Sequence, residues 1–286
     1  MLKLSIITIN LNNADGLRKT MESVFSQTYC DFEYIVIDGV STDGSMDIIR
    51  DYELNNSTSV FAFKWQSELD HGIYEAMNKG VRMAKGEYTL MLNSGDYLLT
   101  PSVIEHIIPL LDGTDIIQCN NIEVRSGMYY RNRGYGRSEL SIYDIMEGVF
   151  LHQASFCKRK LFEQYGYFDE SYTLVADTKF FITCLGVNNA SFKYIDIDVV
   201  NYDKNGISAA RSGPWYQKHM EEYVRLRNEM FPYRYRVYFQ KNEPKVRLYD
   251  KLHRHLWIWN VIRLLVRVCN WIYGAENKGE RIERIQ

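Results

Sequence analysis

The run LKLSIITINLNNADGLRKTMESVFSQTYCDFEYIVIDGVSTDGS, residues 2–45, carries the clearest indication of the architecture of this chain. Residues 2–9 form a short apolar run rich in β-branched side chains, and residues 32–38 form a second one. Between them, residues 15–27 place apolar side chains at a helical spacing, with Asp15 as the expected helix cap. This order of strand, helix and strand predicts the beginning of a parallel sheet.

The alternation continues toward residue 111 and then loosens. Strands that alternate with helices predict an α/β fold, with a mostly parallel, Rossmann-like sheet covered by helices on both faces. We expect helices at 45–52 (capped near Ser45), 72–84 and 102–111, and strands at 60–65 and 87–93. Further along, we expect strands at 115–124 and 192–202 and short helices at 142–148, 158–166 and 176–186.

We expect a catalytic domain over residues 1–212, followed by a helical, basic and amphipathic extension over 213–286. Within the domain, residues 1–115 form the expected nucleotide-binding half and 116–212 the acceptor half. Between residues 214 and 273 there are 12 Lys and Arg against 5 Asp and Glu, a local net charge of +7. The charge pattern therefore separates the extension from an otherwise acidic chain.

Composition excludes several classes of protein. The 286 residues are 46% hydrophobic, which suffices for one sizeable core, and the formal net charge of −2 gives no indication of a nucleic-acid partner. The five cysteines are widely spaced and form no CxxC, so we expect a reducing compartment. No secretory signal and no run of 18 apolar residues occurs, which favours a cytoplasmic protein.

The stretch LWIWNVIRLLVRVCNWIY, residues 256–273, is apolar apart from one narrow polar stripe. One interpretation is a helix that packs on the catalytic domain or on a second copy in a homodimer. The other is a basic amphipathic helix, within 245–273, that binds the inner face of the cytoplasmic membrane peripherally. We favour the membrane.

Polar and acidic residues follow three of the expected strands. They are the segments Thr8-Ile9-Asn10, Asp38 to Ser45, and Asn93-Ser94-Gly95-Asp96. Because ligands of open parallel sheets bind beyond the carboxyl ends of the strands, we expect these segments to meet at one site. Turn chemistry alone would explain any one of them, but less readily all three.

Carboxylates close to an anionic nucleotide diphosphate need a cation between them. Mg²⁺ and Mn²⁺ accept one or two carboxylates together with phosphate oxygens, so Asp96 is the expected metal ligand. Asp38, which a glycine follows, is suited to a base N–H or a ribose hydroxyl. The chain has no GxGxxG after a strand, no GxxxxGK[ST], no GxSxG and no HExxH, so dinucleotide-binding, P-loop, hydrolase and zinc-protease classes lack support.

Six segments, in this order and spacing, resemble the motifs of family-2 glycosyltransferases of the GT-A fold. They are SIITINLN (5–12), DGVSTDGS (38–45), SELDHGIYEAMNKGVRMAKGEYTLMLNSGD (67–96), HQASFCKRKLF (152–162), GYFDESYTLVADTKFF (166–181) and NGIS (205–208). The likeness covers about residues 2–210 and is strongest to bacterial enzymes that build surface polysaccharides and lipid-linked glycans. It implies a nucleotide-sugar donor, typically a UDP-sugar, and a glycan or lipid-linked acceptor.

The resemblance also implies roles for single residues in donor binding. Thr8 and Asn10 would line the nucleotide, Asp38 would bond to the base, and Asp70 and Gly72 would close around the base and ribose. The family's usual Arg-Asn pair reads Met77-Asn78 here, with Lys79 next as a substitute for the arginine against the diphosphate.

The family's Asp-x-Asp metal motif reads Ser94-Gly95-Asp96 in this chain. The resemblance therefore implies that Asp96 binds Mn²⁺ or Mg²⁺, while Ser94 stands in the place of the first carboxylate. One carboxylate fewer should weaken the intrinsic affinity, so that the metal binds chiefly together with the donor.

Asp177 matches the catalytic base of these enzymes, and His152 and Gln153 match a position beside the donor or acceptor. The resemblance implies an inverting transfer of a hexosyl or N-acetylhexosaminyl group. The family's processive motif QxxRW is absent, which indicates that a single sugar is transferred. The alternative is an inactive glycosyltransferase-like scaffold. A receiver domain and a sugar nucleotidyltransferase fit the motifs less well.

Overall fold

The computed structural model describes residues 2–55, 61–125, 128–204, 206, 212–233, 235–237, 240–242, 261 and 264–265. The chain divides into two compact units, Met1–Met230 and Phe231–Gln286. Nearly all of the tail at 245–273 and of the NGIS segment lies outside the described residues, so neither interpretation of the tail is decided. Within the described residues, no helix combines the length and apolarity needed to cross a bilayer.

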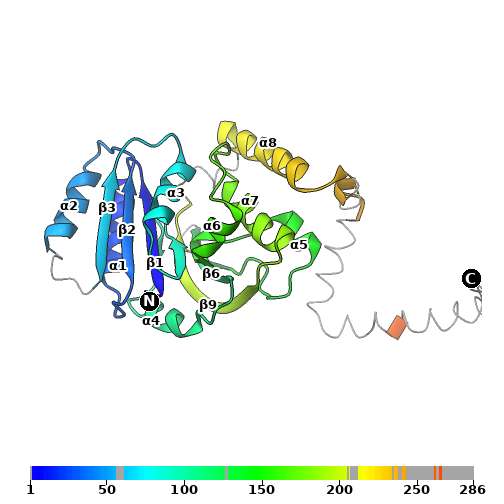
Figure 1. Cartoon of the computed structure of the whole chain (residues 1–286), viewed down its shortest axis with the longest axis horizontal. Coiled ribbons are helices and arrows are strands. Elements are labelled where there is room, and N and C mark those ends of the chain that lie inside the picture. The colour runs from blue at the N-terminus through cyan, green and yellow to red at the C-terminus, as the bar shows by residue number, and fades with distance from the viewer. Residues whose placement is uncertain are drawn as a thin grey trace, which may run out of the picture. The chain divides into compact units, whose positions relative to one another are not determined.

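The first unit is built on one sheet of nine strands (Figure 1). Four parallel strands follow one another from the edge inward, namely β3 (Ala62–Ser67), β2 (Glu33–Asp38), β1 (Leu4–Asn10) and β4 (Tyr88–Met91). The sheet continues through β8 (Ser155–Lys158), β6 (Ile116–Arg125), β9 (Phe192–Tyr202) and β5 (Tyr97–Leu98), while β7 (Met128–Asn132) pairs with β6. The expected α/β sheet is thus present, with β5, β7 and β8 running antiparallel to their neighbours.

Helices cover both faces of the sheet. They are α1 (Ala14–Phe25), α2 (Ser45–Asn55), α3 (Ile73–Met83), α4 (Val103–Ile107), α5 (Ile142–Glu147), α6 (Lys160–Tyr165), α7 (Ala176–Ile182) and α8 (Gly213–Met230). Figure 1 shows α1 and α2 beside β1–β3, and α5, α6 and α7 at the other end of the unit.

Alternation along the strands explains the two faces. Leu4 and Ile6 of β1 belong to the core that packs against α1 and α2. Ile7 points to the opposite face and meets α3, where a Cβ on Gly80 would come within 2.3 Å of the Ile7 side chain. Glycine at this position therefore lets α3 lie close to the sheet.

A buried carboxylate lies at the beginning of β2. Glu33 is 1% exposed, and its side chain accepts hydrogen bonds from the Ser5 hydroxyl at 2.6 Å and the Gly86 N–H at 3.1 Å. The Lys64 ammonium completes the cluster at 2.7 Å. Burial would raise the pKa of Glu33, but these donors hold it below its ordinary value.

Three details differ from the sequence predictions. The helix cap of α1 is Asn13, whose side chain accepts a hydrogen bond from the Gly16 N–H, and Asp15 lies in the first turn. The short strands β5, β7 and β8 were not predicted. The expected domain ends at residue 212, whereas the compact unit includes α8 and ends at Met230.

Candidate functional site

Three polar residues lie side by side where β1, β2 and β3 end. In the strand register, Asn10 is paired with Asp38, and Asp38 with Ser67. The buried Asp38 carboxylate accepts hydrogen bonds from Asn10 Nδ2 at 2.9 Å, Ser67 Oγ at 2.9 Å and Ser41 Oγ at 2.6 Å. The expected meeting of Asn10 and Asp38 is therefore present, and it forms a rigid polar floor.

Thr8 does not reach this surface. Its side chain is completely buried, and its hydroxyl donates to the Leu92 carbonyl at 2.7 Å and accepts from Tyr34 at 3.0 Å. Thr8 and Asn10 share one face of β1, but Thr8 lies two positions further from the end of the strand, beneath its surface. Thr8 thus tethers β1 to the segment after β4, and the expected contact with the nucleotide base has no support in its position.

Lys79 is held by acidic side chains. Its ammonium lies 2.6 Å from Asp70 Oδ1, 2.7 Å from Glu68 and 3.3 Å from Glu75. Gly72 precedes α3 beside this cluster. Burial raises the pKa of Asp70, although the neighbouring Lys79 ammonium acts to lower it. In this conformation Lys79 neutralises its neighbours, so the expected role against the diphosphate would require these contacts to open.

Asn78 has a structural role. It is 1% exposed, and its Nδ2 donates to the Phe168 carbonyl at 2.9 Å and to Glu170 at 2.7 Å. Its Oδ1 accepts from the Phe168 N–H at 3.0 Å. Asn78 therefore clamps the segment that leads to α7, and its expected contact with the donor stays a prediction.

The candidate donor-binding cavity lies at the carboxyl ends of β1, β4 and β9 and has a volume of about 480 Å³. Its walls bring together Ser94 and Asp96 after β4, His152 before β8, and Asp203 after β9. The other lining residues are Asn12, Asn13, Asp15, Gly16, Lys19, Asn93, Tyr202 and Gly206. A cavity of this size can hold part of a nucleotide sugar.

Asp96 is the most perturbed acid of the cavity. It is 3% exposed, and its Oδ1 accepts a hydrogen bond from the Asp203 N–H at 2.8 Å. Burial, helped by the neighbouring Asp203 charge, raises the pKa of Asp96 to about 7. A buried carboxylate with a raised pKa is a site where a cation would lower the cost of ionisation.

Asp177 and His152 form a hydrogen-bonded pair. Asp177 Oδ2 lies 2.9 Å from His152 Nδ1, and Asp177 Oδ1 accepts from the Tyr74 hydroxyl at 2.9 Å. Burial would raise the pKa of Asp177, but the bonds from His152 and Tyr74 leave it below its ordinary value. The pKa of His152 is raised: burial lowers it, but Asp177 and Asp96 outweigh that effect. His152 therefore links the two acids that the sequence singled out.

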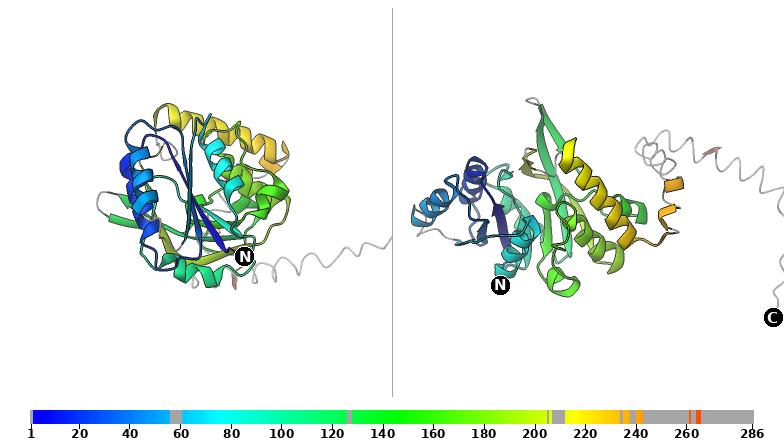
Figure 2. Two further views of the ribbon diagram at one scale, coloured as in Figure 1. Left: turned by 60° about the vertical axis from the view of Figure 1, so that its left-hand side comes forward. Right: turned by 90° about the horizontal axis from the view of Figure 1, so that it is seen from above.

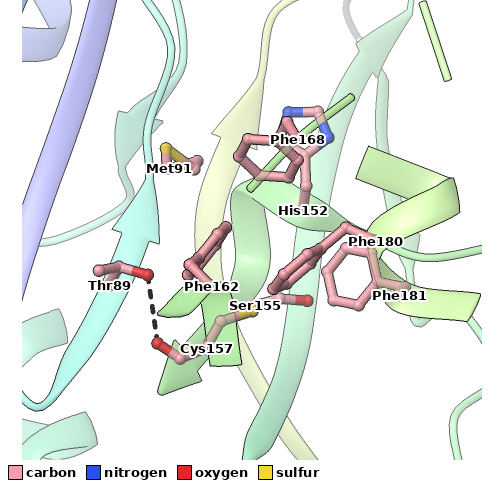
Figure 3. Close-up of a pocket in the computed structure, with 9 residues that line it drawn as sticks. All are labelled: Thr89, Met91, His152, Ser155, Cys157, Phe162, Phe168, Phe180 and Phe181. Atoms are coloured by element: carbon pink, nitrogen blue, oxygen red, sulfur yellow. Dashed lines mark hydrogen bonds between the residues drawn. The ribbon is translucent and has the colours of Figure 1, made fainter. Parts of the chain in front are cut away.

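An apolar wall lies behind His152. Phe162, Phe168, Phe180 and Phe181 line a cavity beside the imidazole ring (Figure 3), and Phe162 stacks on Phe180 with ring centres 4.2 Å apart. This cavity has a volume of only about 10 Å³, which is too small for a sugar.

The position of Asp177 depends on α8. Buried Glu222 of α8 accepts hydrogen bonds from the N–H groups of Thr173 at 2.9 Å and Leu174 at 2.8 Å, directly before α7. Lys179 of α7 also pairs with Glu229 of α8 at 2.8 Å. Figure 2 shows α8 lying along the segment that carries α5–α7. These bonds hold the N-terminal end of α7, where Asp177 is found.

The sequence analysis assigned no role to four residues that complete the site: Asp203, Tyr74, Asn93 and Ser41. Asn93 and Ser41 lie in the polar segments that were expected to form the site, and Asp203 directly follows an expected strand. Tyr74 had no recognisable feature, since only the fold brings it to Asp177, just as the fold brings Asn93 to His152. Gln153 is buried in the turn after His152 and is not among the residues that line the 480 Å³ cavity.

The chain was compared with known proteins by sequence and by structure. The sequence profile described as Glycosyl transferase family 2 matches residues 5–170. A "PGL/p-HBAD biosynthesis glycosyltransferase" of Mycobacterium bovis (strain BCG / Pasteur 1173P2) is 28% identical over 205 residues, which cover 71% of this chain and 77% of that protein. An uncharacterised glycosyltransferase of Mycobacterium tuberculosis (strain ATCC 25618 / H37Rv) is 34% identical over 181 residues, or 62% of this chain and 67% of that protein.

Two solved structures share the fold. Residues 1–349 of Staphylococcus aureus TarS, in complex with UDP-GlcNAc, match with a TM-score of 0.61 and 18% identity, over 79% of this chain and 67% of that one. The mannosyltransferase PcManGT of Pyrobaculum calidifontis, in complex with GDP-Man and Mn²⁺, matches with a TM-score of 0.58 and 18% identity, over 78% of this chain and 64% of that one. At this identity, the likeness concerns the fold alone.

Proposed function

This chain belongs to glycosyl transferase family 2, and on that basis we propose that it moves one sugar from a nucleotide-diphosphate donor to an acceptor hydroxyl, with inversion at the anomeric carbon. The donor is a UDP-sugar carrying a hexosyl or N-acetylhexosaminyl group. The observation that carries the proposal is the 480 Å³ cavity, in which Asp96, Asp203 and His152 meet at the carboxyl ends of the strands.

The nucleoside part of the donor binds at the polar floor formed by Asn10, Asp38 and Ser67. Asn10 Oδ1 is buried without a hydrogen-bond partner among the described residues, so it can accept a bond from a base or ribose donor. Asp70 borders this floor, because a Cβ on Gly39, the residue after Asp38, would lie 3.4 Å from Asp70 Oδ2.

The residues of the cavity fit a divalent cation. Among the described residues, no group of three or more His, Cys, Asp or Glu side chains is placed to hold a metal alone. Asp96 and Asp203 nevertheless offer two hard carboxylates in one cavity, and Mg²⁺ or Mn²⁺ commonly binds through one or two carboxylates and substrate phosphates. Bound there with the donor, the cation would supply positive charge against the leaving diphosphate.

The proton acceptor of the transfer is the pair of Asp177 and His152. The pair lies beside the cavity, and the lowered pKa of Asp177 keeps its carboxylate ionised at neutral pH. A positioned base typically contributes roughly 10²–10⁴-fold to the rate. Phenylalanine side chains border His152 in the small second cavity, which gives the pair an apolar environment there.

We place the enzyme in the synthesis of bacterial surface polysaccharide, with a glycan or lipid-linked acceptor. The support is the resemblance in sequence to a mycobacterial PGL/p-HBAD biosynthesis enzyme. Peripheral attachment to the inner face of the cytoplasmic membrane through 245–273 belongs to this proposal, and a homodimer through the same segment is the competing use. Deletion of 245–286 followed by vesicle co-sedimentation tests it, because unchanged partitioning would contradict attachment.

The transferase is tested with a panel of UDP-, GDP- and dTDP-sugars and Mn²⁺ or Mg²⁺, measured as release of nucleoside diphosphate. We expect release from a UDP-sugar, dependent on the metal and lost in Asp96→Ala. Asp177→Asn should bind the donor as the wild type does but lose transfer. Donor binding without any release by the wild type would instead support an inactive scaffold.

A further inference from the structure

The connection between β3 and α3, residues 68–72, forms one wall of the polar floor. The Glu68 N–H donates to the Asp38 carbonyl at 3.0 Å, which continues the pairing of β3 with β2 by one residue. Two residues later, Asp70 Oδ2 lies next to Gly39, the residue after Asp38. The position of Asp70 beside the floor therefore depends on how this connection is held.

Lys79 reaches back from α3 and holds the connection at three successive residues. Its ammonium lies 2.7 Å from Glu68 Oε1, 3.2 Å from the Leu69 carbonyl oxygen and 2.6 Å from Asp70 Oδ1. These contacts join a helix to the chain segment that precedes it. Lys79 thus fixes the backbone and the carboxylate of the same segment.

Glu75 fastens the end of the connection nearest to α3. Its Oε2 accepts a hydrogen bond from the His71 N–H at 2.6 Å, and its Oε1 lies 3.3 Å from the Lys79 ammonium. One helical turn of α3 separates Glu75 from Lys79, so both side chains act from the same face of the helix. Residues 68–71 are therefore all tied to α3 or to the sheet.

The Lys79 ammonium has no hydrogen left for a further ligand. An ammonium carries three N–H groups, and four acceptors surround this one, three of them carboxylates. The cluster as a whole is anionic, which disfavours the approach of a diphosphate. Lys79 is also not among the residues that line the 480 Å³ cavity with Asp96 and Asp203.

Asp70, in contrast, keeps one oxygen available. Its Oδ1 is bound to Lys79, while none of the described residues donates a hydrogen bond to its Oδ2. Only 10% of the Asp70 side chain is exposed, so this oxygen is held at a defined place. A fixed acceptor costs less entropy on binding than one that must first be ordered.

We propose that Lys79 is a positioning residue of the nucleoside site: it holds Asp70 so that Oδ2 accepts a hydrogen bond from the base or ribose of the donor, and it makes no contact with the diphosphate. This inference rests on the proposed transferase function. It replaces the expected role of Lys79 as a substitute for the family's arginine.

Uridine and UDP separate the two roles, because uridine carries the nucleoside without the diphosphate. The full-length chain is titrated with each ligand in the presence of Mn²⁺. Lys79→Met should weaken both ligands by the same factor, about tenfold, the value of one hydrogen bond to a charged group. Lys193→Met is the matched control and should bind both as the wild type does, because it removes the same charge from an ion pair with Asp112 outside the cavity.

Two further variants show whether Lys79 acts through Asp70. Lys79→Arg retains the charge and should recover most of the affinity for both ligands. Asp70→Asn should weaken both ligands, and the double variant Lys79→Met with Asp70→Asn should be no weaker than Asp70→Asn alone. A merely structural role of Lys79 would instead give losses that add. Thermal unfolding shows that each variant is folded.

The outcomes that overturn the proposal are distinct from failure of the transferase. A loss confined to UDP, in Lys79→Met or in Lys79→Arg, would place Lys79 against the diphosphate. Additive losses in the double variant would remove the link to Asp70. A wild type that binds neither uridine nor UDP would contradict the UDP-sugar donor itself, and this inference with it.

Discussion

The Asp96 carboxylate accepts a 2.8 Å hydrogen bond from the backbone N–H of Asp203, which lies 107 positions later in the chain. Gly95, directly before Asp96, adopts φ +105°, and a Cβ at that position would come within 2.7 Å of Asp203 Oδ2. The segment after β4 and the end of β9 are therefore joined in close contact. This joint brings a second carboxylate, that of Asp203, into the cavity that Ser94 and Asp96 line.

Asp203→Asn should weaken metal binding. If Asp203 and Asp96 bind the cation together, loss of the Asp203 charge should lower the Mn²⁺ affinity of the UDP-bound protein by about 10- to 100-fold, the usual range for supporting ligands. Isothermal titration of Mn²⁺ into the UDP-saturated protein measures this. Asp15→Asn is the matched control, because Asp15 lines the same cavity from an exposed position. Equal affinities of Asp203→Asn and the wild type would remove Asp203 from the site.

Asp96→Asn should stabilise the metal-free protein at alkaline pH. The folded-state pKa of about 7 lies above the ordinary 3.8, so stability falls as the pH rises through this window and the cost is complete above pH 7. At pH 8 the variant should therefore have a free energy of unfolding greater by up to a few kcal/mol. Urea denaturation at pH 8 and pH 4 measures the difference, which should nearly vanish at pH 4.

Bound metal should remove the stability advantage of Asp96→Asn over the wild type at pH 8. Mn²⁺ with UDP should raise the melting temperature of the wild type at pH 8, because it binds the ionised carboxylate, and should have little effect on Asp96→Asn. A variant that is no more stable than the wild type at pH 8 without metal would show that Asp96 is ionised without cost in the folded protein.

Asn78→Ala should destabilise the protein and slow the reaction together. The substitution leaves the buried N–H and carbonyl of Phe168 without their partner, which should lower the free energy of unfolding by about 3 kcal/mol. Donor affinity should change less than kcat, because the clamp holds the segment before Asp177. Asn55→Ala, at an exposed site at the end of α2, is the control and should change stability by less than about 0.5 kcal/mol. If Asn78→Ala instead loses donor affinity while its stability is unchanged, Asn78 contacts the donor directly.

Glu33→Gln should destabilise the protein in a pH-dependent way. The pKa of Glu33 is lowered in the folded state, so its contribution is present above its ordinary value of 4.5 and is lost as the pH falls through the lower, folded value. At pH 7 the variant should lose about 2 kcal/mol, the range of a hydrogen bond to a charged group. Chemical denaturation at pH 7 and pH 3 should show the difference shrinking; a constant difference would contradict the role of the charge.

The sequence predicted the first half of the sheet well, because β1, β2 and β4 are continuous apolar runs that are buried on both faces. It missed β5 and β8, which have two and four residues, because so short a strand is defined by its partner and not by its own pattern. The pairing of β5 with β9 depends on residues about a hundred positions away.

The candidate site shows the same limit. Strand ends placed Asp38 and Asp96 correctly at the edge of the sheet, since that follows from topology. Motif spacing could not show that Thr8 points inward, or that Lys79 is surrounded by carboxylates. Those outcomes depend on neighbours that only the folded chain supplies.

The two residues of β5 have a practical consequence for engineering. β5 begins directly after Asp96, and its ladder with Asn201 and Val200 of β9 ends just before Asp203. A slip of one position in this ladder would turn every side chain of the moved strand to the other face. Chimeras that exchange acceptor halves among homologues should therefore transplant residues 93–98 and 199–203 as a single cassette.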